Sequence, residues 1–112
     1  MTDYNVVYTS EEEKNRWRNE RWERDGVSNL LSKDGFTFKS HGRSGYIYYT
    51  EQGTLIEIYV EMSGVKEYDM SVYFDENLER FPNRTILNED EKEIMRGKLL
   101  AWLDHKGIRN DL

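Results

Sequence analysis

Tyrosines and carboxylates alternate along the middle of the chain, and their spacing places them on one side of predicted β-strands. Every second residue of a strand points to the same face, so a period of two defines which side chains share a surface. Tyrosine is enriched where proteins dock, and carboxylates attract cations, so the pattern predicts a partner-binding face. The alternative is an ordinary solvated sheet face, since tyrosine forms strands well and carboxylates keep a sheet soluble. The predicted face consists of Tyr46, Tyr48, Glu57, Tyr59, Glu61, Asp69, Tyr73 and Asp75.

The negative charge of the chain is concentrated around the same residues. The formal net charge is −6, whereas residues 51–91 alone contain 11 acidic and 3 basic side chains and carry a net charge of −8. Such a field attracts a basic protein partner and repels nucleic acid. The arginines of residues 16–24 do not change this expectation, because the glutamates between them leave no unneutralised basic patch. We therefore predict a basic protein partner and no nucleic-acid ligand.

Few residues of the chain are suited to catalysis or metal binding. There is no cysteine, and neither an H-E-x-x-H nor a G-x-S-x-G motif occurs. His41 and His105 are not part of a cluster with the spacing of metal ligands. We predict no metal, no cofactor and a non-catalytic protein, and Glu61 with Asp69 is the one candidate acid–base pair, if the strand register brings them together. The loop 41–45 fits a hairpin turn better than a phosphate cradle, because it matches no phosphate-binding motif.

Alternating side chains predict the strands that position these residues, at 36–40, 46–50, 55–62 and 68–75. Such alternation is typical of an antiparallel sheet with one packed face and one solvated face. Residues 51–54 fit a four-residue hairpin loop, and this loop sets the register of the strands on either side. The resulting pairs are Thr50 with Leu55, Ile47 with Ile58, and Tyr48 with Glu57. The apolar face consists of Phe36, Phe38, Ile47, Tyr49, Ile56, Ile58, Val60, Met62, Tyr68, Met70, Val72 and Phe74.

A helix is predicted ahead of the strands, over residues 11–24. Ser10 followed by Glu13 is a capping-box pattern, which marks a helix start. Trp17 is the expected anchor of this helix, and few other apolar side chains line it, so we expect it to pack weakly by one edge. Before this helix, residues 4–9 contain strand-forming side chains and are a candidate edge strand.

The final helix is predicted over residues 89–106. Asn88 and Glu91 form a second capping box, and Gly107 suits the position just after the helix end. Its apolar residues recur at helical spacing, so this helix is expected to cover the apolar face of the sheet. The apolar stripe consists of Ile94, Met95, Leu99, Trp102 and Leu103, widened by Leu100 and Ala101.

Together these elements predict an α+β fold. It contains an antiparallel sheet of about four strands, a long C-terminal helix packed on one face and an N-terminal helix at its edge; the sequence leaves open which face the N-terminal helix contacts. At 112 residues the chain is predicted to be a single domain over 1–112. No apolar run approaches ~20 residues and the first residues lack a signal-peptide pattern, so no membrane span is expected and a cytoplasmic location is predicted.

The arrangement resembles that of small acidic bacterial α/β domains, among them immunity proteins of polymorphic toxin systems. The similarity rests on the sequence at 45–49, the sequence at 55–58, and the capped helix 89–106 with Trp102 and Gly107. The resemblance implies a non-catalytic inhibitor that binds a toxin domain, often a basic one, through an acidic surface. It carries over only the tyrosine–carboxylate face and implies no catalytic residue.

Two further functions remain open at the level of the sequence. A homo-oligomer, such as a homodimer, would bury the tyrosine face by symmetry. A small-molecule binder or hydrolase would need a concave pocket between the sheet and the first helix. The presence or absence of such a pocket, together with the mass of the protein in solution, distinguishes these functions from binding of a protein partner.

Overall fold

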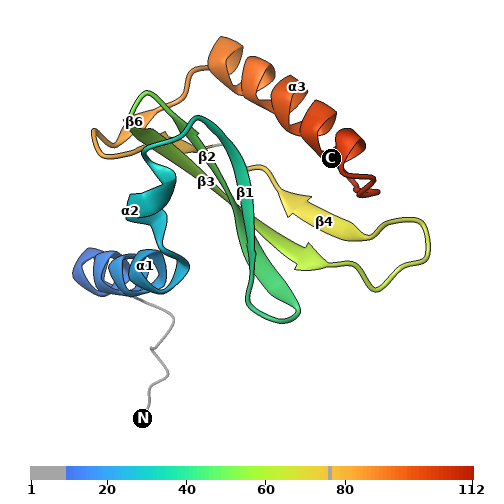
Figure 1. Cartoon of the computed structure of the whole chain (residues 1–112), viewed down its shortest axis with the longest axis horizontal. Helices are drawn as coiled ribbons and strands as arrows, with labels where there is room; N and C mark the ends of the chain where they lie inside the picture. Colours follow the sequence, from blue (N-terminus) through green and yellow to red (C-terminus); the bar gives the residue numbers. More distant parts are fainter. Residues whose placement is uncertain (1–9, 76) are drawn as a thin grey trace.

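The computed structural model of the chain describes residues 10–75 and 77–112 and has the predicted α+β architecture (Figure 1). Its elements are α1 (Glu11–Asp25), α2 (Val27–Leu30), β1 (Gly35–Ser40), β2 (Ser44–Glu51), β3 (Thr54–Met62), β4 (Met70–Tyr73), β5 (Glu79–Arg80), β6 (Thr85–Ile86) and α3 (Glu89–His105). The four-stranded antiparallel sheet, in the order β1-β2-β3-β4, lies between α3 on one side and α1 with α2 on the other (Figure 1). The candidate strand at residues 4–9 lies outside the described residues.

The register predicted for the β2–β3 hairpin is confirmed. All three predicted pairs are present: Thr50 with Leu55, Ile47 with Ile58, and Tyr48 with Glu57. The turn is shorter than predicted, because Glu51 and Thr54 also pair and leave only Gln52 and Gly53 between the strands. Both turn residues have positive φ, 50° and 76°, which matches the right-handed twist of a two-residue hairpin. Shortening the loop by one pair keeps every side chain on its predicted face.

The helix α3 covers the apolar face of the sheet, as predicted. Its capping box between Asn88 and Glu91 is present on both sides, and the helix ends before Gly107, whose φ is 71°. Only part of the predicted stripe is buried, since the row at i, i+4 spacing faces the sheet and its neighbours turn away. The buried row consists of Met95, Leu99 and Leu103, and Trp102 is partly buried. The prediction was wrong for Ile94, Leu100 and Ala101, because all three side chains are exposed.

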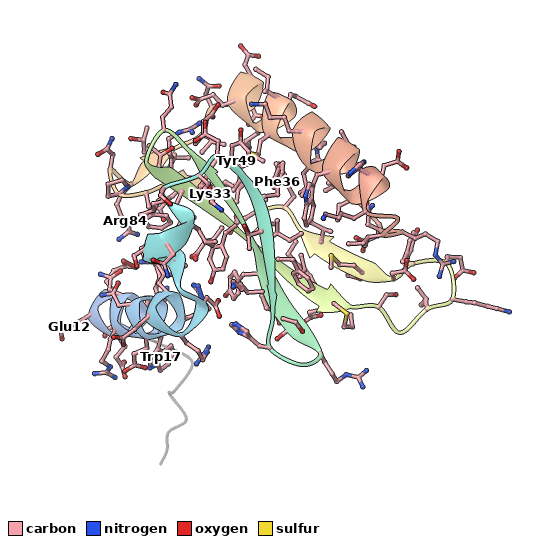
Figure 2. The ribbon with its side chains drawn as sticks, in the orientation of Figure 1. Glu12, Trp17, Lys33, Phe36, Tyr49 and Arg84 are labelled. Atoms are coloured by element: carbon pink, nitrogen blue, oxygen red, sulfur yellow. The ribbon has the colours of Figure 1, made fainter. Side chains whose placement is uncertain are left out.

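The helix α1 lies on the face opposite α3, which resolves the question that the sequence left open. It starts with the predicted capping box between Ser10 and Glu13. Trp17 is not its anchor: that side chain is 53% exposed and lies on the side of α1 away from the sheet (Figure 2). Trp22 takes this role, with its ring 5.1 Å from that of Phe81 in an edge-on contact. A second, smaller core forms there from Val27, Tyr48, Leu55 and Phe81, with Trp22, Leu30, Leu31 and Tyr46 packed against it.

Between β4 and α3, β5 and β6 form a small hairpin over residues 79–86. Leu78, just before this hairpin, and Phe81, in its turn, are both buried. The backbones of Phe81 and Leu55 exchange two hydrogen bonds, of 2.8 and 2.9 Å, which fix the segment beside the start of β3. The chain between β4 and α3 therefore forms a wall next to the polar face of the sheet.

The last residues of the chain run along the outer strand β4. The backbone carbonyl of Arg109 accepts hydrogen bonds from the amides of Asp69 and Met70, and the Asp111 carboxylate accepts one from the amide of Val72. The strand β4 is shorter than the predicted 68–75. No helix in the described part of the chain is long and apolar enough to cross a membrane.

Candidate functional site

The helix α1 divides the predicted tyrosine–carboxylate face into a covered part and an open part. Tyr48 is fully buried, and the side chain of Glu57 is 15% exposed. Tyr48 lies beneath α1 and is closed to a partner while this helix is docked, whereas the small exposed part of Glu57 lines a groove beside the helix. The sequence did not indicate this, because the residues of α1 that reach the sheet are polar or amphipathic and do not form an apolar stripe.

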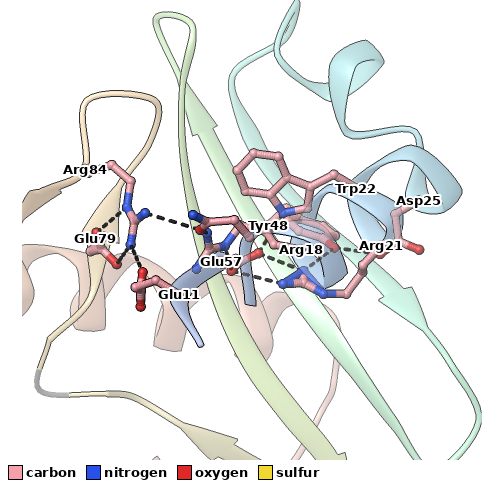
Figure 3. A network of polar contacts seen from close by, with 10 residues as sticks. Glu11, Arg18, Arg21, Trp22, Asp25, Tyr48, Glu57, Glu79 and Arg84 are labelled. Carbon is pink, nitrogen blue, oxygen red and sulfur yellow. Dashed lines mark hydrogen bonds and ion pairs between the residues drawn. The ribbon is translucent and has the colours of Figure 1, made fainter. Parts of the chain in front are cut away.

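Glu57 is the residue that fixes α1 to the sheet (Figure 3). The guanidinium of Arg21 donates to both of its carboxylate oxygens, at 2.9 and 3.1 Å, and the indole N–H of Trp22 donates at 2.8 Å. Arg18 adds an ion pair at 3.4 Å. A carboxylate that accepts a two-pronged arginine bond and an indole N–H in a partly buried setting is strongly positioned. The spacing of Arg18, Arg21, Trp22 and Asp25 places them on one face of a helix, and this polar stripe was the available sequence signal.

A second polar cluster joins the end of α1 to the sheet. The carboxylate of Asp25 accepts a hydrogen bond of 2.6 Å from the Tyr48 hydroxyl and contacts Nε2 of His41 at 2.7 Å. Burial alone would raise the pKa of Asp25, but the hydrogen bonds from Tyr48 and His41 outweigh it, and the pKa is lowered. Burial and the bond to Asp25 raise the pKa of Tyr48 far above its usual range. The predicted hairpin turn at 41–45 is confirmed by the bond from the His41 amide to the Ser44 carbonyl. Because His41 contacts Asp25, this turn also contacts α1.

Replacing Tyr48 with phenylalanine should lower the free energy of unfolding by about 2 kcal/mol at neutral pH, because a hydrogen bond to a charged group contributes roughly 1.5–3 kcal/mol. The pKa of Asp25 is lowered from 3.8, so its contribution is present above that pH and is lost as the pH falls through the lower folded value. The difference in stability between the two proteins should therefore narrow as the pH is lowered below 3.8, as measured by urea unfolding at a series of pH values.

Tyr49→Phe is the matched control for this measurement. Tyr49 is also buried, but its hydroxyl contacts the ammonium of Lys98 at 3.2 Å and no carboxylate, so its effect should not narrow in acid. A Tyr48→Phe effect that stays constant from neutral to acid pH would contradict the assignment of Asp25 as the charged partner.

The open part of the face is centred on three tyrosines in register. Tyr46 on β2 pairs with Tyr59 on β3, which pairs with Tyr73 on β4. The ring centres are 5.4 Å apart in each step, so the rings form a continuous aromatic row. Tyr73 is 49% exposed at the outer end of the row. We call these three residues the tyrosine row.

Glu61 lies one step beyond the row on the same face of β3. Its two carboxylate oxygens accept hydrogen bonds of 2.8 Å each, one from the Tyr59 hydroxyl and one from the Tyr73 hydroxyl. The bonds from Tyr73 and Tyr59 lower the pKa of Glu61, which therefore stays ionised. Within the described residues no lysine, arginine or histidine forms an ion pair with it. Glu61 is thus an oriented negative charge without a cationic partner.

A groove of about 780 Å³ runs along the tyrosine row. The helix α1 contributes Arg18 to one side, and residues 74–75, 77–79 and 81 contribute the other. Three carboxylates line the groove: Glu57 and Glu79 are ion-paired with arginines, whereas no described cation forms an ion pair with Asp75. Arg84 holds this wall in place, because it binds Glu79 at 2.8 Å and reaches α1 through Glu11 at 3.8 Å (Figure 3). The lining is Arg18, Tyr46, Glu57, Tyr59, Val72, Tyr73, Phe74, Asp75, Asn77, Leu78, Glu79 and Phe81.

The remaining residues of the predicted face are separated from one another. Asp75 lines the groove, whereas Asp69 is bound by Arg109 at 2.9 Å and is not part of the lining. Glu61 pairs across the strands with Ser71, so Glu61 and Asp69 have different partners and do not form the acid–base pair that the sequence left open. Sequence reasoning missed Arg18, Leu78 and Phe81 as parts of this site, because each belongs to a segment that only the fold brings to the sheet.

Comparison with known proteins identifies no relative of this chain. No protein-family model matches the chain, and no curated protein or solved structure matches it significantly. In the described part of the chain no three histidine, aspartate or glutamate side chains come together as a metal site would require.

Proposed function

We propose that this protein is a protein-binding domain that accepts a basic segment of a partner in the groove beside the tyrosine row. The observation that carries the proposal is the combination of the aromatic row with Glu61, an oriented carboxylate that no described cation neutralises. Aromatic side chains are preferred anchors at protein interfaces, and a basic side chain is attracted both by their rings and by the carboxylate. An inhibitor of the immunity type is the form of this function that the resemblance in sequence implies.

The proposed surface is smaller than the one predicted from the sequence. It retains Tyr46, Tyr59, Glu61, Tyr73 and Asp75, which lie along or beside the groove. Tyr48 and Glu57 support it from below, because they hold α1 in the position that forms one side of the groove. The acidic charge of the surrounding chain would speed the approach of a basic partner and make the binding sensitive to salt.

The test is capture of the partner from the native lysate, followed by a measurement with the purified partner. Tagged protein is washed at low and at high salt, captured proteins are identified by mass spectrometry, and the affinity of each is measured by calorimetry. We expect a basic partner whose affinity falls at least about tenfold for the double variant Tyr59→Ala with Glu61→Lys, since interface anchors contribute more than 1 kcal/mol each. Trp17→Ala is the matched control, because Trp17 is an exposed aromatic outside the groove and should not change the affinity.

Two results would overturn the proposal. One is a captured partner whose affinity is the same for the double variant and the unmodified protein. The other is recovery of only the protein itself, with a dimer in light scattering that the double variant converts to a monomer, which would assign the tyrosine row to self-association.

A small-molecule ligand is a second candidate for the same groove. Its volume of about 780 Å³ lies within the roughly 300–1,000 Å³ that is usual for small-molecule sites. Binding of a metabolite with micromolar affinity, abolished by the same double variant and without any protein partner, would favour this candidate.

A further inference from the structure

Two glutamates occupy equivalent positions along β3, on either side of Tyr59. Glu57 and Glu61 are four residues apart and lie on the same face of the strand. The first of these glutamates, Glu57, binds an arginine of the same chain. The guanidinium of Arg21 donates to both oxygens of Glu57 (Figure 3). It also lies 3.8 Å from the centre of the Tyr46 ring. The protein thus contains one complete unit of tyrosine ring, glutamate and arginine.

The second glutamate, Glu61, also lies beside tyrosine rings, but no arginine of the described residues binds it. Glu61 is flanked by the rings of Tyr59 and Tyr73, whose hydroxyls hold its carboxylate in a fixed orientation. An ionised carboxylate offers about four lone-pair directions, so two remain after the tyrosine hydroxyls are accepted. Lys39 and Arg43, the basic residues of the neighbouring β1–β2 hairpin, form no ion pair with Glu61. The arginines of α1 that reach β3, Arg18 and Arg21, both contact Glu57, and neither forms an ion pair with Glu61.

We propose that Glu61, with Tyr59 and Tyr73, is a receptor for an arginine side chain of the partner, which would reproduce the contact that Arg21 makes with Tyr46 and Glu57. The inference rests on the proposed function and specifies its ligand chemistry. Arginine fits better than lysine because its planar guanidinium stacks on an aromatic ring while it donates to a carboxylate. Lysine is a compact point charge and cannot make both contacts in the same plane.

The experiment uses the complete chain and two short peptide probes, acetyl-Gly-Arg-Gly-amide and acetyl-Gly-Lys-Gly-amide. Each is titrated into isotope-labelled protein and followed by the backbone amide resonances of β3 and β4. We expect the arginine peptide to shift the amides of Tyr59, Glu61 and Tyr73 with an affinity at least about fivefold higher than that of the lysine peptide. The Glu61→Gln variant should bind the arginine peptide with an affinity at least about tenfold lower, because the substitution removes the charge and keeps the size of the side chain.

Glu67→Gln is the matched control. Glu67 is an exposed glutamate in the loop between β3 and β4, so its replacement changes the net charge equally but should leave the affinity for the arginine peptide unchanged. Equal binding of both peptides, or equal weakening by both glutamine variants, would show a general attraction of positive charge and would overturn the arginine receptor.

Failure of this inference and failure of the proposed function give different results. If the purified partner still requires Tyr59 but binds the Glu61→Gln variant as tightly as the unmodified protein, the groove binds a protein by other contacts and only the arginine receptor is lost. If the arginine peptide binds selectively but no protein partner depends on the groove, the receptor stands and the role in protein binding is lost.

Discussion

Replacing Glu57 with alanine is expected to lower the free energy of unfolding by about 3 kcal/mol, because removing one partner of a largely buried ion pair leaves the other charge uncompensated. Glu57 accepts four of the contacts that hold α1: two bonds from Arg21, one from Trp22 and the ion pair with Arg18. Without it, the guanidiniums of Arg18 and Arg21, whose side chains are 18% and 13% exposed, would lose the charge they face. Urea unfolding followed by circular dichroism measures the change.

Glu61→Ala is the control for this variant. It removes the same side chain from the same face of the same strand, but its contacts are the hydroxyls of the partly buried Tyr59 and the exposed Tyr73, and no described cation. We expect a clearly smaller loss of stability than for Glu57→Ala. If the two variants lost equal stability, α1 would be attached mainly by its other contacts, the bonds of Asp25 to Tyr48 and His41 and the contact of Trp22 with Phe81, and not by Glu57.

Leu99→Ala is expected to lower the free energy of unfolding by about 3 kcal/mol, within the roughly 2–5 kcal/mol measured for leucines in closed cores. Leu99 is completely buried between α3 and the sheet, in the row that also contains Met95 and Leu103. The loss combines the transfer of the leucine side chain with the cavity that remains, because helix and sheet relax only partly around it. Calorimetric or urea unfolding gives the value.

Ile94→Ala tests the same helix on its outer side. Ile94 is 61% exposed, so its replacement should change the stability by less than about 0.5 kcal/mol, as is usual at surface positions. A loss at Ile94 as large as that at Leu99 would mean that α3 buries a different stripe from the one described here.

The sheet and its register were predictable because local rules specify them. Alternation assigns each side chain of β2 and β3 to a face, and a slip of one residue would move Ile47 and Ile58 to the polar face. The helix starts at Ser10 and Asn88 were equally clear, because a capping box requires residues only three positions apart. These features depend on neighbours in the sequence or on a single turn.

The site was predictable only in part, because its boundaries depend on contacts between distant segments. Arg21 and Glu57 are 36 residues apart, and nothing local distinguishes Glu57 from Glu61 on the same strand. An apolar stripe on α1 favours Trp17 over Trp22 as the anchor, because it does not account for a tryptophan whose ring packs on the core while its indole N–H donates to a carboxylate. Amphipathic contacts of this kind are decided by the tertiary structure and not by the period of the sequence.

The course of the last residues along β4 has a consequence for the behaviour of the protein in solution. An outer strand with unpaired backbone groups is a template to which a strand of another molecule can add. The segment around Arg109 and Asp111 occupies two of these groups on β4, the amides of Met70 and Val72, the second through the side chain of Asp111. Deletion of residues 108–112 should expose this edge and make the protein aggregate more readily on concentration, because another strand could then add to β4.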